Sequence, residues 1–191
     1  MSQERLDIFR SLLATMKPGR LLDLGCGHGK FSILARDLGW RVTAVDARSD
    51  RWPAAGGIEW VQSDVRDFDD FDGYDTIAML GLLYHLELPA QVDLLRRCAP
   101  TPLILDTHVA VTPDSELGHY RGRIFKEVED DVDLEACATA AWGNRFSFWA
   151  SSESLRQLLR DCGYGFTFEL QPWYMRDRTF WLATQPPTPG A

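Results

Sequence analysis

Cysteine is scarce in this sequence, and long apolar runs are absent. The four cysteines are Cys26, Cys98, Cys137 and Cys162. They lie far apart and form no Cys-x-x-Cys pair, which argues against a disulfide framework or a structural zinc site. No stretch reaches the roughly 18 continuous apolar residues that a membrane helix needs. We therefore expect a cytoplasmic protein with reduced thiols and no membrane partner.

Basic residues are outnumbered by acidic ones. The chain has 20 lysines and arginines against 28 aspartates and glutamates, which gives a formal net charge of -8 at pH 7. Non-specific affinity for nucleic acid comes mainly from Lys and Arg that neutralise phosphates. The charge balance therefore disfavours a nucleic-acid partner, and the sequence leaves the oligomeric state open.

The composition is that of a folded domain. Hydrophobic residues make up 45% of the 191 residues and charged residues 25%, close to the average for globular proteins. A chain of this length can bury one sizeable core. We expect a single domain over residues 1–185 and a disordered tail at residues 186–191, whose sequence is PPTPGA.

Apolar runs and helical periods alternate along the chain. Strands are predicted at residues 20–24, 42–45, 58–61, 74–80, 103–105, 166–170 and 179–183. An amphipathic helix is predicted at residues 6–13, and further helices at residues 30–38, 88–98 and 152–161. Alternation of this kind predicts an α/β fold with a doubly wound, seven-stranded and mostly parallel sheet. The last two strands are expected to form an antiparallel pair at its edge.

The segment at residues 111–150 has no strand signal and is too long for a plain connection. It contains the aromatic residues Tyr120, Phe125, Trp142, Phe146, Phe148 and Trp149. Because it follows the fifth strand, it would emerge at the carboxyl edge of the sheet, where open α/β sheets place their ligands. We predict a substrate lid; alternatively, the aromatic residues only pack the insertion onto the sheet.

The sequence DLGCGHG, residues 23–29, places three glycines between a predicted strand and a predicted helix. Without side chains, the backbone amides of such a loop can approach a ligand closely. The spacing of Gly25, Gly27 and Gly29 is GxGxG. Dinucleotide-binding loops have the spacing GxGxxG, so the loop disfavours NAD.

Acidic residues stand at the ends of three predicted strands. Asp23 precedes the glycines, and Asp46 follows about twenty residues beyond the loop, where a carboxylate can accept both hydroxyls of a ribose. Asp64 ends the third strand in QSDVRDF, where it can bind the amino group of an adenine. Carboxyl ends of neighbouring parallel strands meet at one edge, so the three acids surround one crevice.

The stretches LLDLGCGHG, VTAVDA, WVQSDVRDF and YDTIAMLGLLYHLE occur in this order between about residues 18 and 110. Through them the chain resembles the class I, Rossmann-like S-adenosylmethionine-dependent methyltransferases. The stretches GLLYHLE, RGRIFKE and FSFWASSESL are loosely similar to methyltransferases that modify glycans or natural products.

The resemblance implies S-adenosylmethionine as the cofactor and S-adenosylhomocysteine as its product. It also implies a set of cofactor-binding residues at the strand ends, namely Asp23, Gly25, Cys26, Gly27, Asp46, Ala47, Asp64, Val65 and Leu80. Within this set, residues 23–27 and Leu80 would border the methionine end. Asp46 would hold the ribose, and Asp64 with Val65 the adenine.

Histidines supply the candidate bases. Methyl transfer from a sulfonium needs a nucleophile aligned about 3 Å from the methyl carbon, and a hydroxyl nucleophile must also lose its proton. His85 follows the fourth strand, on the loop that faces the donor methyl in the family, and is the first candidate. His108, two residues after Asp106, is the second. No spacing is diagnostic of a metal site, and none is expected.

We therefore expect methyl transfer from S-adenosylmethionine to a hydroxyl of a small molecule or glycan. N-methylation of a small amine is an alternative, because a neutral amine needs no base. A noncatalytic module that binds the cofactor is a second alternative. A nicotinamide-dependent oxidoreductase is disfavoured by the loop spacing and by the absence of a YxxxK pair.

Thermal unfolding with saturating S-adenosylmethionine, S-adenosylhomocysteine or NAD tests the cofactor prediction. A ligand at about 100 times its dissociation constant stabilises the folded state by roughly 2.7 kcal/mol when it does not bind the unfolded chain. We expect both adenosyl compounds to raise the midpoint by several degrees and NAD to leave it unchanged. Unchanged midpoints with all three ligands, confirmed by calorimetry, would contradict a methyltransferase.

Overall fold

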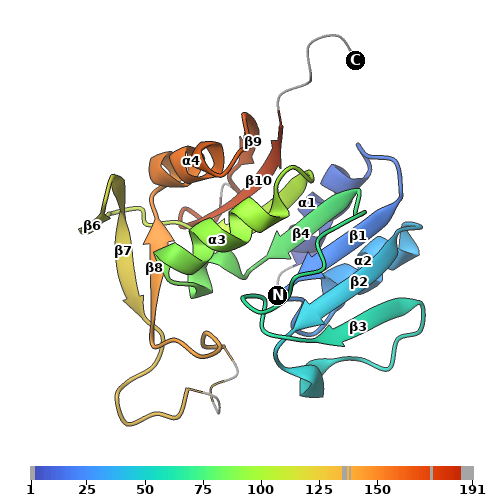
Figure 1. The fold of residues 1–191 in the computed structure, drawn as a ribbon, viewed down its shortest axis with the longest axis horizontal. Helices are drawn as coiled ribbons and strands as arrows, with labels where there is room; N and C mark the ends of the chain where they lie inside the picture. Colours follow the sequence, from blue (N-terminus) through green and yellow to red (C-terminus); the bar gives the residue numbers. More distant parts are fainter. Residues whose placement is uncertain (1–2, 135–136, 138, 173, 186–191) are drawn as a thin grey trace.

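The computed structural model describes residues 3–134, 137, 139–172 and 174–185, so the tail predicted at residues 186–191 lies outside the described residues. The main sheet consists of β1 (Arg20–Leu24), β2 (Arg41–Asp46), β3 (Ile58–Gln62), β4 (Thr76–Leu80), β5 (Leu103–His108), β9 (Phe166–Leu170) and β10 (Arg178–Thr184). Its order is β3-β2-β1-β4-β5-β10-β9 (Figure 1). Strands β1 to β5 pair in parallel, whereas β10 is antiparallel to β5 and β9. The predicted seven-stranded, mostly parallel sheet is confirmed.

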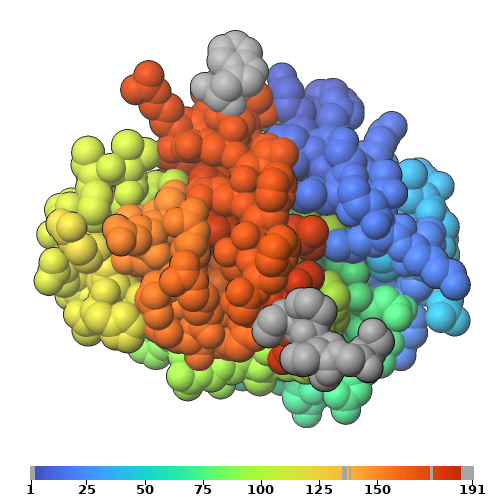
Figure 2. Space-filling view, turned by 90° about the horizontal axis from the view of Figure 1, so that it is seen from above, coloured from blue at the N-terminus to red at the C-terminus, as the bar shows by residue number. Residues whose placement is uncertain are grey.

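Helices cover both faces of this sheet. Helices α1 (Gln3–Leu13) and α2 (Lys30–Asp37) lie on one face, and α3 (Leu88–Cys98) and α4 (Ser152–Asp161) on the other (Figure 1). Helix α4 begins at Ser151, whose hydroxyl accepts a hydrogen bond from the Ser154 amide at 3.2 Å. Seen from above, the orange and red carboxyl-terminal part of the chain forms the middle of the surface, between the blue amino-terminal part and a yellow region (Figure 2).

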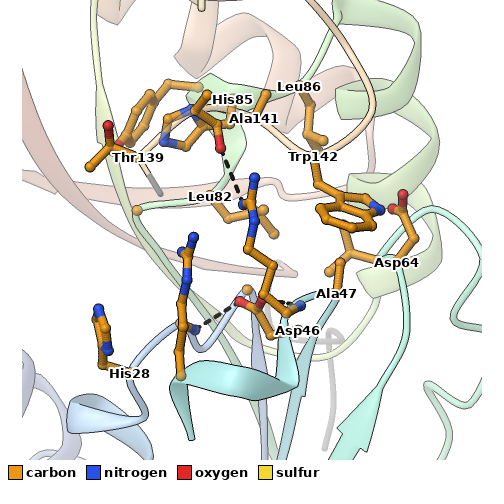
Figure 3. Close-up of a pocket in the computed structure, with 18 of the residues that line it drawn as sticks. His28, Asp46, Ala47, Asp64, Leu82, His85, Leu86, Thr139, Ala141 and Trp142 are labelled. Carbon is orange, nitrogen blue, oxygen red and sulfur yellow. Dashed lines mark hydrogen bonds between the residues drawn. The ribbon is translucent and has the colours of Figure 1, made fainter. Parts of the chain in front are cut away.

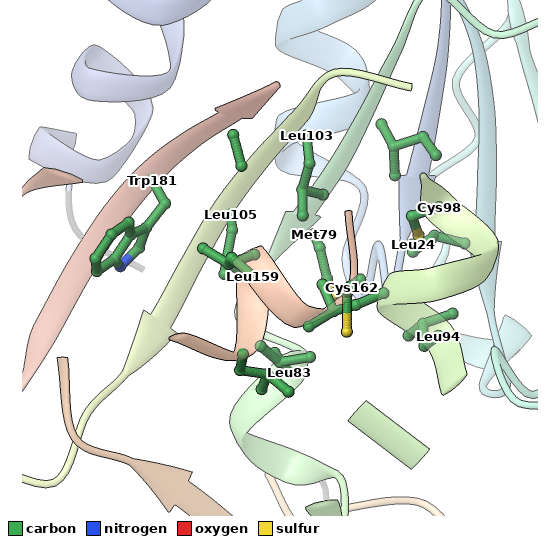
Figure 4. Close-up of a cluster of buried hydrophobic side chains, with 14 of the residues drawn as sticks. Leu24, Met79, Leu83, Leu94, Cys98, Leu103, Leu105, Leu159, Cys162 and Trp181 are labelled. Carbon is green, nitrogen blue, oxygen red and sulfur yellow. The ribbon is translucent and has the colours of Figure 1, made fainter. Parts of the chain in front are cut away.

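Buried apolar side chains form one cluster on each face. Successive residues of a strand point to opposite faces, so Ile104 and Leu105 of β5 enter different clusters. Phe180 and Trp181 of β10 divide in the same way, and both are fully buried. Figure 4 shows Leu105 and Trp181 beside Leu159 of α4. Burial of each such side chain contributes about 1.5–3 kcal/mol, so these contacts fix the sheet between its helices.

The expectation that residues 111–150 form no strand is wrong. This segment contains β6 (Ser115–Leu117), β7 (Tyr120–Lys126) and β8 (Phe146–Ala150), which pair as a three-stranded antiparallel sheet. On β7, Tyr120 and Gly122 are buried, while Arg121 and Arg123 are exposed. Because charged residues and a glycine occupy much of β7, the alternation of buried and exposed residues along the strand could not be recognised in the sequence.

The small sheet is anchored to the main fold through β8. The Phe148 amide donates to the carbonyl of Leu86 at 3.0 Å, and the Phe148 side chain is 2% exposed within the core. On β7, the Arg121 amide donates to the Ser154 hydroxyl of α4 at 2.7 Å. The described residues that follow β7, 127–134, and those that precede β8, 139–145, contain no helix or strand and extend from this anchored sheet (Figure 1).

Substitution of Gly122 by Ala tests the packing of β7 against β8. An added Cβ would lie 2.3 Å from the Trp149 carbonyl oxygen and 2.6 Å from the Phe148 ring, so the strands would have to separate. We expect a loss of about 1–3 kcal/mol in the free energy of unfolding, measured by urea titration. Gly56→Ala is the control, because its Cβ would meet nothing within 4 Å. Equal midpoints for both variants would contradict this packing.

Candidate functional site

The carboxyl edge of the main sheet borders a cavity of about 330 Å³ (Figure 3). The loops after β1, β2, β3 and β4 supply most of its wall. We call residues 111–150 the inserted segment. Residues 139–142 of this segment line the other side of the cavity. Open α/β sheets place their ligands at this edge, so the cavity is the candidate binding site.

The glycine loop turns sharply between β1 and α2. Gly25 and Gly27 have φ angles of 69° and 53°, in the left-handed region that side chains disfavour. The amide of Gly25 donates to the carbonyl of Val45 at 2.8 Å, which joins the loop to the end of β2. Both glycines line the cavity.

Asp46 lies at the end of β2 with its carboxylate fixed in orientation. Its Oδ2 accepts a hydrogen bond from the Gly27 amide and its Oδ1 one from the Arg48 amide, each at 2.8 Å (Figure 3). Each carboxylate oxygen can accept a further bond. Asp46 and the neighbouring Ala47 both line the cavity, so an acceptor for hydroxyl groups is presented there.

Asp64 and Val65 line the cavity beyond Ala47. The Arg66 side chain donates from Nε to both oxygens of Asp64, at 3.0 and 3.1 Å, and the Arg66 amide donates to Oδ1 at 2.9 Å. Partial burial raises the pKa of Asp64, but these hydrogen bonds outweigh it and hold that pKa below its ordinary value. Asp64 is therefore ionised at neutral pH.

Asp23, Cys26 and Leu80 are not among the residues that line the cavity. Asp23 is 1% exposed and accepts a hydrogen bond from the Ser32 hydroxyl of α2 at 2.5 Å. Burial raises the pKa of Asp23 to about 7, and it also raises that of the Cys26 thiol far above its usual range. The side chain of Asp23 is thus held by α2, and those of Cys26 and Leu80 are buried in the apolar core, while the predicted cofactor contacts of the three residues stay predictions.

His85 lines the cavity and is held by a carboxylate of the inserted segment. Its Nδ1 lies 3.1 Å from both oxygens of Glu127, whose side chain is 2% exposed. Glu127 also accepts hydrogen bonds from the Ser147 hydroxyl at 2.6 Å and the Ala141 amide at 3.0 Å. Glu127 does not stand out in the sequence, since it is one of several acids at residues 127–133. These contacts fix the His85 ring and favour a proton on Nδ1.

His108 does not line the cavity. Its Nε2 lies 2.8 Å from Nη1 of Arg178, and its Nδ1 lies 3.1 Å from the carbonyl oxygen of Asp177. Burial and the charge of Arg178 lower the pKa of His108. Since both ring nitrogens have partners, the geometry does not support the predicted role of His108 as a base. Arg178, which pairs with His108 where β10 lies beside β5, was not singled out from the sequence.

Arginines join the inserted segment to the loops after β2 and β3. Arg48 donates to the carbonyl of Ala140 at 3.3 Å and lies over the Trp142 ring, 5.0 Å from its centroid. Arg66 donates to the carbonyl of Trp142 at 2.8 Å. Neither arginine was singled out from the sequence, because isolated arginines in loops resemble solvated surface residues.

The described part of the chain contains neither a membrane-spanning helix nor a group of metal ligands. None of its helices combines the length and the apolar character that crossing a bilayer requires. Among the same residues, no three His, Cys, Asp or Glu side chains are grouped so that they could hold a metal ion.

The sequence matches a family described as a methyltransferase domain over residues 2–167, and the chain belongs to that family. The prediction of an S-adenosylmethionine-dependent methyltransferase is thereby confirmed. No curated protein sequence matches the chain.

Solved structures of methyltransferases share the fold. The N-terminal domain of EvdMO1 with bound S-adenosylhomocysteine has a TM-score of 0.74 and 23% identity, over 96% of this chain and 80% of that one. The 1,6-didemethyltoxoflavin-N1-methyltransferase of Burkholderia thailandensis, with its substrate and S-adenosylhomocysteine, has a TM-score of 0.64 and 18% identity, over 96% and 78%. The glycopeptide N-methyltransferase MtfA has a TM-score of 0.66 and 16% identity, over 94% and 95%. The predicted class I methyltransferase fold is confirmed.

Substitution of Asp23 by Asn tests the burial of this carboxyl. Its pKa is raised from 3.8 to about 7 in the folded protein, so the unfolded chain releases the proton first as the pH rises. The folded state therefore loses about 4 kcal/mol of stability in total as the pH rises from about 4 to 8. We expect urea unfolding to show this loss in the unmodified protein and not in the Asn variant. Parallel pH dependences of the two proteins would contradict the raised pKa.

Proposed function

We propose that this protein transfers a methyl group from S-adenosylmethionine to a hydroxyl of a small molecule or sugar, with His85 as the base. The observation that carries the proposal is the His85–Glu127 pair, with Nδ1 and carboxylate oxygens 3.1 Å apart, in a cavity that Asp46 also lines. Family membership supports the reaction class. A cytoplasmic location is proposed on the sequence alone.

The cavity wall fits the chemistry of the cofactor. Asp46 offers carboxylate oxygens to the ribose hydroxyls, and the ionised Asp64, with Val65, suits the amino group of an adenine. The backbone of Gly25 and Gly27 leaves room for the methionine end. When bound there, S-adenosylmethionine supplies an electrophilic methyl group on a positively charged sulfur.

His85 is oriented for proton removal. The Glu127 carboxylate accepts the Nδ1 proton, which leaves the lone pair on Nε2 for the acceptor hydroxyl. When the hydroxyl oxygen takes the methyl group and the bond from that carbon to sulfur breaks, Nε2 would accept the hydroxyl proton and the ring would become cationic. The buried charge of Glu127 stabilises that cation, as carboxylates do beside catalytic histidines elsewhere. Glu127 is a positioning residue because it acts through His85.

The inserted segment at residues 111–150 is proposed as the substrate lid of a single domain spanning residues 1–185. Thr139, Ala141 and Trp142 of this segment line the cavity opposite the strand ends, where they can exclude water from the acceptor (Figure 3). A structure of the N-terminal domain of EvdMO1 in the presence of S-adenosylhomocysteine and D-fucose supports a sugar acceptor. N-methylation of a small amine is the alternative, because two of the solved structures with this fold are N-methyltransferases.

Substitutions of His85 and Glu127 test the proposed base. With a panel of sugar and small-molecule hydroxyl acceptors, we expect His85→Gln to lower kcat by about 100- to 10,000-fold, because the acceptor keeps its proton. Glu127→Gln should lower kcat less, and Glu127→Asp should recover part of the loss. Formation of S-adenosylhomocysteine measures the rate, and calorimetry checks that its dissociation constant is unchanged.

Glu129→Gln is the matched control for Glu127. Its side chain is 78% exposed, contacts Lys126, and belongs to the same acidic run. It should leave kcat unchanged. Full activity of His85→Gln towards a hydroxyl acceptor would rule out the proposed base. Activity confined to amine acceptors, and retained in that variant, would instead favour N-methylation.

A further inference from the structure

Two arginines converge on one buried carboxylate beside the cavity. Asp106 of β5 is completely buried, and Arg178 of β10 donates to it from Nε to Oδ1 at 2.6 Å and from Nη2 to Oδ2 at 3.0 Å. Arg5 of α1 donates from Nε to Oδ2 at 2.8 Å, and its Nη2 contacts the same oxygen. We call these three residues the arginine cluster. The arginine cluster joins α1 to β5 and β10.

The arginine cluster carries an excess positive charge. Two guanidinium groups face one carboxylate, so one positive charge is left without a partner within the cluster. Arg178 is only 6% exposed, and its remaining nitrogen contacts His108. Arg5 is 12% exposed, and its Nη1 makes no hydrogen bond to any residue that the structure describes. The available donor of the cluster therefore belongs to Arg5.

Arg5 reaches the cavity wall beside Gly81. Both residues line the cavity, whereas Asp106 and Arg178 do not. A Cβ at Gly81 would lie 3.1 Å from Nη2 of Arg5 and 3.2 Å from Nη2 of Arg178. The absence of a side chain at this position allows the two guanidinium groups to approach the end of β4. A cationic donor is thus presented to the cavity at this strand.

The strand order places the arginine cluster at one end of the proposed cofactor site. Asp64 follows β3, Asp46 ends β2, the glycine loop follows β1, Gly81 follows β4, and the cluster is centred on β5. Neighbouring strands are about 4.8 Å apart, so the end of β4 lies roughly 10 Å from that of β2. A cofactor with its adenine at Asp64 and its ribose at Asp46 therefore directs its amino-acid end towards Arg5.

We propose that Arg5 binds the α-carboxylate of the methionine portion of the cofactor. This inference rests on the proposed function. The carboxylate is the only anionic group of S-adenosylmethionine, while its sulfonium and ammonium groups are positive. An excess guanidinium charge attracts the first and repels the others. Asp106 and Arg178 are positioning residues that hold Arg5 against the cavity.

Replacement of Arg5 should leave the fold intact. Without Arg5, Asp106 keeps both hydrogen bonds to Arg178, so no buried charge loses its last partner. The substitution Arg5→Gln can therefore be examined in the folded protein, with the thermal midpoint as a check. Arg10→Gln is the matched control, because Arg10 lies exposed on the same helix.

Calorimetric titration with two ligands tests the proposal. S-adenosylhomocysteine carries the carboxylate, and 5′-methylthioadenosine has the same adenosyl group without the amino-acid portion. We expect Arg5→Gln to raise the dissociation constant of S-adenosylhomocysteine by about tenfold or more and to leave that of methylthioadenosine unchanged. Arg5→Lys should recover part of the affinity. Arg10→Gln should bind both ligands as the unmodified protein does.

Other outcomes would overturn the proposal. Equal losses of affinity for both ligands in Arg5→Gln would show that Arg5 acts through the structure of the site. Unchanged affinity for S-adenosylhomocysteine would show that the carboxylate binds elsewhere. The arginine cluster would then be available to bind an acidic acceptor. If the unmodified protein binds neither ligand, the proposed function itself fails, together with the inference that depends on it.

Discussion

Burial of the central strands on both faces is the constraint on which this structure depends. Every residue of β4 is buried, and β5 is buried as far as Thr107. A polar side chain inside such a strand needs a partner, because burial without one costs about 1–3 kcal/mol. Asp23 has the Ser32 hydroxyl, and Asp106 has two guanidinium groups. The polar side chains that are open to a ligand are therefore found where the strands end, on one edge of the sheet.

The fold and the strand-end part of the site could be predicted from the sequence because both depend on local patterns. The glycine loop and Asp46 follow apolar runs directly, Asp64 comes three residues after one, and parallel strands bring their carboxyl ends together. Contacts between distant segments could not be predicted in this way. Glu127 meets a histidine 42 residues earlier in the chain, and Arg5 meets an aspartate 101 residues later. Neither residue stands out locally, since an acid in an acidic run and an arginine on an amphipathic helix both resemble solvated side chains.

The inserted segment is where prediction and structure differ most. Its strands were missed because β7 alternates arginines with small or aromatic residues, and only the pairing with β8 reveals the pattern. The same pairing explains its attachment, as β8 is bound to the loop after β4 through Phe148 and Leu86. Arg48 and Arg66 hold residues 140–142 from the opposite side. The segment is thus fixed both at the end of β4 and near Asp46 and Asp64.

The hydrogen bonds between His85 and the inserted segment also bear on how such a protein can diversify. The carbonyl of His85 accepts a bond from the Asn144 side chain, and its ring is held by Glu127. A replacement of the segment, or a change in its length, would alter the surroundings of the acceptor and the orientation of the histidine in a single event. New acceptors would then be reached more readily by substitutions on its cavity-facing residues, such as Thr139 and Trp142, than by exchange of the whole segment.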